Sequence, residues 1–256
     1  MSLPLIVFSW AVVVLTGWVA GRLAKVSLKA GSLPEGLLAL FFGSGAAAYA
    51  LLLLPGSISF AVEGQQLIRQ LAATLLAVPP VAVVLFTWLV FRRQDGWARS
   101  LAWLLGTAAF STVVFAEWLA APLGVAAQVS LAEPTAFFWL AMAVKAACYG
   151  WTCLEACAFY GKACKREAAG LMDAVVANRF LLWAVWSGAA SAMVALKIVN
   201  VVFFLQVVDG QRVTPAPLVL LTIAGGLACV GAVCLTFAPP AFYRRWLLAR
   251  AGSSQL

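Results

Sequence analysis

Charged residues are scarce in this sequence, and histidine is absent. Only 10% of the 256 residues are charged, whereas 64% are apolar and the mean hydropathy is +1.01. A soluble domain usually contains about 25% charged residues, because roughly a quarter to a third of the unfolded surface stays exposed after folding. The sequence therefore excludes a soluble enzyme, a disordered protein and a disulfide-stabilised secreted domain. We expect a multi-pass protein of a cell membrane, the bacterial inner membrane.

The missing residue types also exclude several kinds of site. Without histidine, bis-His haem and His-based copper or zinc sites are excluded. None of the six cysteines forms a C-x-x-C pair, and thiols within apolar segments usually pack as small hydrophobic side chains. There is no H-E-x-x-H motif, aspartate pair or Ser/Lys set at a common depth. We expect no enzymatic activity, no cofactor and no metal.

Long apolar runs are what the sequence does contain. About 20 apolar residues cross the hydrocarbon core as a helix, and the runs do not alternate as the strands of a barrel would. The first run lacks a preceding basic region and is followed by Arg22 and Lys25, so we expect a first span rather than a signal peptide. The fold class predicted is an all-α membrane protein with a seven-helix bundle at residues 1–238. The spans are Pro4–Arg22, Pro34–Pro55, Leu67–Phe91, Trp97–Ala121, Thr135–Tyr160, Arg179–Gln206 and Pro215–Ala238.

The basic residues between these spans predict the orientation. Cytoplasmic loops carry an excess of lysine and arginine. One side would hold Arg22, Lys25, Lys29, Arg92, Arg93, Arg99, Lys162, Lys165, Arg166, Arg179, Arg244, Arg245 and Arg250, and the other only Arg69 and Arg212. We therefore expect the N-terminus outside and the C-terminus in the cytoplasm.

The last 18 residues, 239–256, predict a short amphipathic cytoplasmic tail. Phe242, Trp246 and Leu247 would face the acyl boundary while the three arginines face headgroups. The formal charge of +8 is explained by these flanking residues, so we expect the lipid bilayer as a partner and no nucleic acid.

Small-residue clusters raise the question of an internal repeat. Gly43–Ala48 and Ser187–Ala192 occupy matching spans, and helices one to three and five to seven would then be parallel repeats in a 3+1+3 arrangement. Such clusters also recur by chance, since close helix packing selects them. Both interpretations stay open.

The layout resembles that of known membrane proteins. Seven helices with an outside N-terminus resemble microbial rhodopsins and other heptahelical bundles, although residues 215–238 lack their seventh-helix lysine. The 3+1+3 layout is similar to sugar transporters of the SWEET type, whose proline–glutamine signature is absent. The phrase Val176–Trp183, VANRFLLW, resembles bacterial seven-helix integral membrane proteins, a likeness that implies no activity.

Ionisable residues within the spans are the main functional signal. Lys145, Lys197, Glu117 and Arg69 fall in the outer half of the predicted bundle. Burying such groups costs several kcal/mol and suggests function. We expect Glu117, Lys145 and Lys197 to face the interior, Lys145 and Lys197 at similar depth, with Glu117 pairing with one lysine. The surplus positive charge would attract an anion.

Polar residues on the fifth and sixth helices extend this candidate ligand site. Lys145, Cys148, Thr152 and Glu155 fall on one face at i, i+3, i+7 and i+10, with Tyr149 beside it. Asn200 lies one turn from Lys197. The predicted ligand-binding set is Arg69, Glu117, Lys145, Tyr149, Thr152, Glu155, Lys197 and Asn200. Internal ion pairs that fix helix register are the alternative.

Two functions follow from this set. The first is binding or transport of a small anionic solute through the outer charged group. The second is a heptahelical receptor that signals through a cytoplasmic protein partner docked on the basic loop Gly161–Asn178. The sequence favours the first. Pro79-Pro80 in the third helix would kink or unwind a turn and mark a hinge or a cavity wall.

Overall fold

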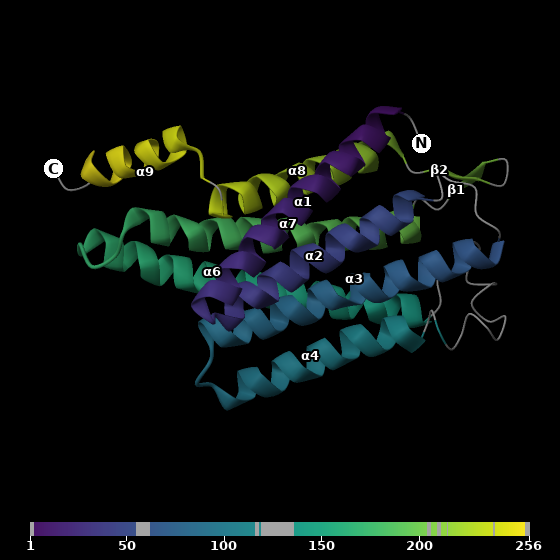
Figure 1. Cartoon of the computed structure of the whole chain (residues 1–256), viewed down its shortest axis with the longest axis horizontal. Coiled ribbons are helices and arrows are strands. Elements are labelled where there is room, and N and C mark those ends of the chain that lie inside the picture. The colour runs from purple at the N-terminus through teal and green to yellow at the C-terminus, as the bar shows by residue number, and fades with distance from the viewer. Residues whose placement is uncertain are drawn as a thin grey trace. The chain divides into compact units, whose positions relative to one another are not determined.

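The part of the chain that the structure describes is almost entirely α-helical, as the sequence predicts (Figure 1). The computed structural model describes residues 3–54, 62–115, 118, 136–203, 206–208, 211–213, 215–237 and 239–253. The chain divides into two compact units, Met1–Cys148 and Tyr149–Leu256. The helices are α1 (Leu3–Ala30), α2 (Leu33–Leu53), α3 (Val62–Phe91), α4 (Gly96–Val114), α6 (Ala136–Ala168), α7 (Ala174–Phe203), α8 (Ala216–Phe237) and α9 (Ala241–Ser253).

Each predicted span overlaps one of the first seven of these helices. Among the described residues, five helical stretches are long and apolar enough to cross a membrane: Ser9–Ala30, Leu33–Leu53, Gly64–Phe91, Ala174–Phe203 and Ala216–Phe237. They support a multi-pass membrane protein. Helix α4 is described over only 19 residues, and α6 carries Lys145 and Glu155 among its apolar residues. That α4 and α6 span the membrane stays a prediction, and so does the orientation of the chain in the membrane.

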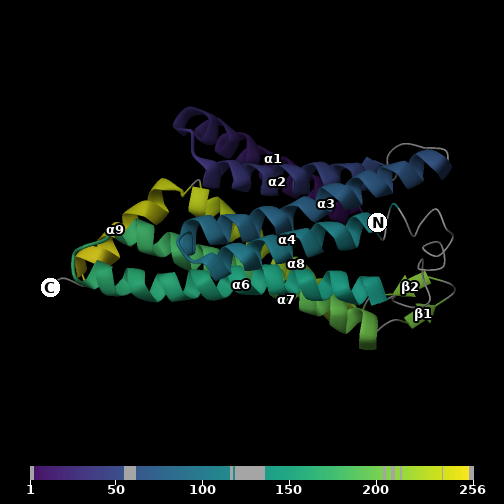
Figure 2. The same ribbon diagram turned by 90° about the horizontal axis from the view of Figure 1, so that it is seen from below.

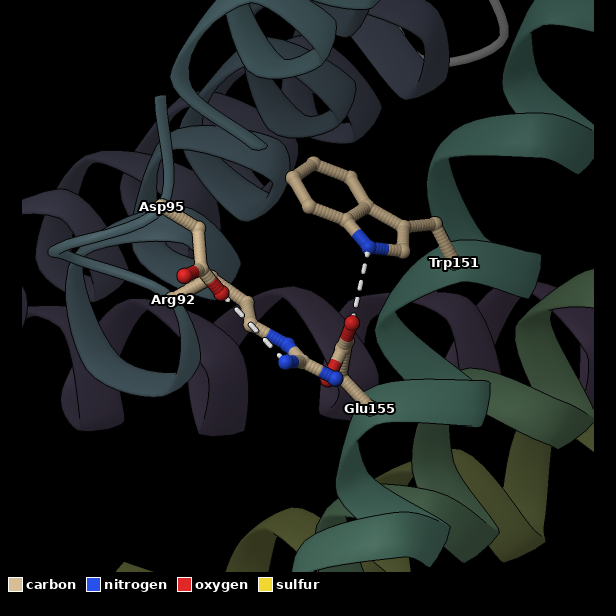
Figure 3. A network of polar contacts seen from close by, with 4 residues as sticks. All are labelled: Arg92, Asp95, Trp151 and Glu155. Atoms are coloured by element: carbon tan, nitrogen blue, oxygen red, sulfur yellow. Dashed lines mark hydrogen bonds and ion pairs between the residues drawn. The ribbon is translucent and has the colours of Figure 1, made fainter. Parts of the chain in front are cut away.

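In the first unit, α1, α2, α3 and α4 pack in sequence order. Small residues bring α1 and α2 together, because a Cβ atom at Gly43 would lie 3.6 Å from the Cβ of Ala20. The turn between them uses the positive φ of 61° at Gly31, which glycine adopts without strain. The turn between α3 and α4 contains an ion pair of 3.3 Å between Arg92 Nη1 and Asp95 Oδ2 (Figure 3).

Helix α3 continues through Pro79 and Pro80 without interruption. Both prolines are buried. The sequence predicts that they kink the helix or unwind a turn; of these two effects, unwinding is not present, because residues 62–91 are helical throughout. The bend that they would cause stays a prediction.

In the second unit, the connection between α6 and α7 is shorter than the predicted loop. Helix α6 runs to Ala168 and α7 begins at Ala174, so most of Gly161–Asn178 is helical. Gly170, with φ of 71°, ends α6, where the Leu171 N–H donates to the Arg166 carbonyl at 2.8 Å. At the start of α7 the Val175 N–H donates to Asp173 Oδ1 at 2.7 Å. The predicted basic loop is thus mostly helix, and the docking of a cytoplasmic partner on it stays a prediction.

A two-stranded antiparallel hairpin follows α7, where the sequence predicts only helix and loop. Strands β1 (Gln206–Val208) and β2 (Gln211–Val213) pair with Gln206 opposite Val213. The prediction that the helix extends to Gln206 is therefore wrong. The hairpin and α9 lie at opposite ends of α7 (Figures 1 and 2).

The predicted tail forms helix α9, which packs against α7. Phe242 and Trp246 are exposed, as an interfacial helix requires, but Leu247 is only 6% exposed. The expectation that Leu247 faces the acyl boundary is wrong, because the protein itself covers this side chain.

Candidate functional site

The polar face of α6 is largely buried. Cys148 and Thr152 are fully buried, Glu155 is 6% exposed, and Lys145 and Tyr149 are partly exposed. The indole Nε1 of Trp151 donates to Glu155 Oε1 at 3.3 Å (Figure 3). Thr152 and Glu155, which their spacing places on one face of α6, are thus both buried. A buried carboxylate needs such donors, because leaving it without them costs more than the hydrogen bond is worth.

Small residues bring α6 and α7 into close contact in the second unit. A Cβ atom at Gly188 would lie 3.4 Å from Cys153 Sγ, and one at Gly150 would lie 3.9 Å from Ser191 Oγ. The Cys153 thiol also donates to the Ala184 carbonyl at 3.5 Å. The side of α7 that faces α6 therefore carries Ala184, Gly188 and Ser191. Gly188 and Ser191 belong to the small-residue cluster Ser187–Ala192, so this cluster takes part in close helix packing.

A different side of α7 faces α8. The Cys229 thiol of α8 donates to the Trp186 carbonyl at 3.6 Å. A Cβ atom at Gly225 would lie 2.9 Å from Met193 Cγ. Lys197 and Asn200 follow Met193 by four and seven residues, which places them within about 60° of it around the helix. They therefore lie on the α8 side of α7.

This register separates the predicted site residues of the second unit into two groups. Gly150 lies opposite Ser191, so Glu155 lies at a level more than about 15 Å from Lys197 along α7. Thr152 and Glu155 form one buried group on α6. Lys197, which is exposed, and Asn200, which is partly exposed, form another near the end of α7. Spacing within single helices did not reveal this separation.

The Lys197 group lies beside the start of α8. Helices α7 and α8 are antiparallel neighbours, and Met193 meets Gly225. Counting back from Gly225 at 1.5 Å per residue puts Lys197 about level with the second turn of α8 and Asn200 about level with the first. The N-terminus of a helix carries a partial positive charge of roughly half a unit. An ammonium, a carboxamide and a helix N-terminus are three groups that attract an anion.

Of the predicted site residues in the first unit, Arg69 lies on α3, where it is exposed. Five residues further along α3, Thr74 Oγ1 accepts a hydrogen bond of 2.8 Å from Trp118 Nε1. Glu117 lies outside the described residues. The pairing of Glu117 with a lysine thus stays a prediction.

An aromatic cluster on α7 is the feature that the sequence analysis did not single out. The rings of Trp183 and Trp186 meet edge to face at 5.1 Å between centroids, and those of Tyr149 and Phe237 each contact one of them at 6.0 Å. The i, i+3 spacing of the two tryptophans is the signal that would have indicated it. Tyr149, predicted as a ligand residue, therefore has an aromatic partner in the packing of the unit.

The chain matches no protein-family model, no curated protein and no solved structure. Within the described ranges, no three Cys, Asp or Glu side chains gather closely enough to hold a metal ion. The chemistry of the site residues therefore carries the functional interpretation.

Proposed function

We propose that this chain is a seven-span membrane protein, N-terminus outside, that binds or transports a small anionic solute at the hairpin end of α7. The observation that supports the proposal is the position of Lys197 and Asn200, on the α8 side of α7 and level with the first turns of α8. An ammonium inside a membrane-length helix suggests function by default. Because the Asn200 amide and the N-terminus of α8 lie beside the Lys197 ammonium, the function that these groups favour is binding of an anion.

The sequence places further ionisable residues within the outer half of the predicted spans. In the predicted orientation these are Arg69, Lys145 and Lys197 against Glu117, while the outer connections add Arg212 and the acidic residues Glu63, Glu133 and Asp209. The solute would approach from the outside, where Lys197 is exposed. The buried pair of Thr152 and Glu155 on α6 would offer a polar step deeper in the membrane if the solute is carried across.

Anion-dependent thermal stability of the purified full chain tests the proposal. The probes are inorganic phosphate, sulfate, acetate and succinate, each added to the protein in lipid nanodiscs at constant ionic strength. A ligand that binds the folded state raises the melting temperature as its concentration exceeds the Kd. We expect at least one probe to stabilise the wild type, and Lys197→Met and Asn200→Asp to abolish this effect while the unliganded protein still folds.

Two variants serve as matched controls. Lys162→Met removes an exposed lysine from α6, and Ser191→Ala removes the hydroxyl on the opposite, α6-facing side of α7. Both should keep the anion effect. The proposal is overturned if no probe stabilises the wild type, or if Lys197→Met responds to the anions as Lys162→Met does.

A further inference from the structure

Helix α9 is fixed to α7 through one side of its first two turns. The hydroxyl oxygen of Tyr243 accepts a hydrogen bond of 2.9 Å from Asn178 Nδ2. The Tyr243 ring stacks on that of Trp246 at 5.8 Å, and Leu247 is buried. These contacts hold α9 in one orientation, so that its opposite side is presented in a defined way.

The outward side of α9 combines large apolar side chains with positive charge. Phe242 is 70% exposed and Trp246 53% exposed, and Arg245 between them is exposed too. The α9 sequence contains three arginines and no acidic residue. Exposed aromatic residues alternating with arginine are typical of helices that lie at the membrane–water interface.

The neighbouring helix ends extend the positive charge. Lys165 and Arg166 at the end of α6 and Arg179 at the start of α7 are exposed in the same unit; the acidic residues between them are Glu167, which is half-buried, and Asp173, whose Oδ1 accepts the Val175 N–H. This end of α7 lies opposite the hairpin and opposite the proposed solute site (Figure 2). Clusters of about four to eight lysines and arginines beside membrane helices or on an amphipathic helix are typical of binding to anionic lipids.

We infer that α9, together with these ends of α6 and α7, is a binding surface for the headgroups of anionic phospholipids. Arg245 and Arg179 contact phosphate groups, while Phe242 and Trp246 enter the acyl boundary and hold α9 in the interface. A soluble acidic peptide would match the arginines equally, but it leaves the two exposed rings unexplained. The inference requires the multi-pass membrane protein and is independent of the solute site at the other end of α7.

Hydrogen–deuterium exchange of the full chain in nanodiscs tests this surface. One preparation contains phosphatidylcholine only, and another contains about one-third phosphatidylglycerol, enough to give a negative surface potential. We expect the amides of residues 241–253 to exchange several-fold more slowly in the anionic discs. Arg245→Gln should remove about fivefold of that protection, since one arginine near an anionic surface contributes about this factor. Salt at about 1 M should reduce the wild-type protection strongly.

The controls separate headgroup binding from structural and ionic effects. Arg69→Gln, which removes an exposed arginine from α3, should retain full protection. Inorganic phosphate added to neutral discs should give none. Equal exchange of the wild type in both discs would overturn the inference. So would an Arg245→Gln variant that exchanges faster by the same factor in both discs, since that result indicates a purely structural role.

Discussion

The indole N–H of Trp151 donates to Oε1 of Glu155 across one turn of α6, at 3.3 Å. Glu155 is almost fully buried, so this donor stabilises a carboxylate that has left water. Substitution Trp151→Phe keeps an aromatic ring and removes the donor. We expect it to lower the free energy of unfolding by about 1–2 kcal/mol. In a chain of this size, each kcal/mol lost lowers the melting temperature by about 2–4 °C.

A matched tryptophan provides the control for this prediction. Trp103 on α4 is 57% exposed, and Trp103→Phe should change stability by less than about 0.5 kcal/mol. Thermal unfolding of both variants in the same detergent measures the difference. Equal shifts for the two substitutions would show that the Trp151–Glu155 hydrogen bond contributes nothing to stability.

Two adjacent glycines of α8 give a second prediction about the contact with α7. A Cβ atom at Gly225 would lie 2.9 Å from Met193 Cγ, whereas one at Gly226 meets no atom within 4 Å. Both substitutions to alanine gain up to about 1 kcal/mol of helix propensity. We expect Gly226→Ala to be neutral or stabilising, and Gly225→Ala to be less stable than it by about 1–2 kcal/mol, because Met193 must move.

Denaturation of the two variants in parallel measures this difference in stability, since the substitutions differ only in the space available for the added Cβ atom. If Gly225→Ala is as stable as Gly226→Ala, the close approach of α8 to Met193 is not present in the protein. The register that places Lys197 beside the start of α8 would then lose its support as well.

The orientation of the chain gives a third prediction. Thirteen basic residues on one side of the predicted spans and two on the other place the N-terminus outside. An epitope tag before Ser2 should be digested by protease added to intact spheroplasts. A tag after Ser254 should be digested only after lysis. Digestion of both tags from the same side would contradict the seven-span topology.

Helix positions were predictable because apolar runs of membrane length leave few alternatives. Helix ends were not, because helical hydrogen bonding continues past the apolar residues: α1 runs to Ala30 beyond Arg22, and α6 to Ala168 beyond Tyr160. The hairpin at Gln206 had a sequence signal that the sequence interpretation missed: Asp209-Gly210 separates Val208 from Gln211, and Asp-Gly is typical of two-residue hairpin turns. Short pairings of this kind depend on the turn between them rather than on hydrophobic periodicity.

For the candidate site, spacing predicted which residues share a face of one helix but not which faces meet. Thr152 and Glu155 are buried together, as their positions on α6 indicate. Lys197 and Asn200 lie on the α8 side of α7, which the sequence of α7 alone does not specify. The contacts that decide it, from Gly225 to Met193 and from Cys229 to Trp186, involve residues far apart in the chain.

The most direct test of the anion site is a pair of experimental density maps of the full chain in lipid nanodiscs. One map is recorded with the probe anion that stabilises the wild type most, and one without it. The account predicts additional density within hydrogen-bonding reach of the Lys197 ammonium and the Asn200 side-chain amide, beside the first turn of α8. Maps that are identical there, with Lys197 surrounded by acyl chains in both, would contradict it.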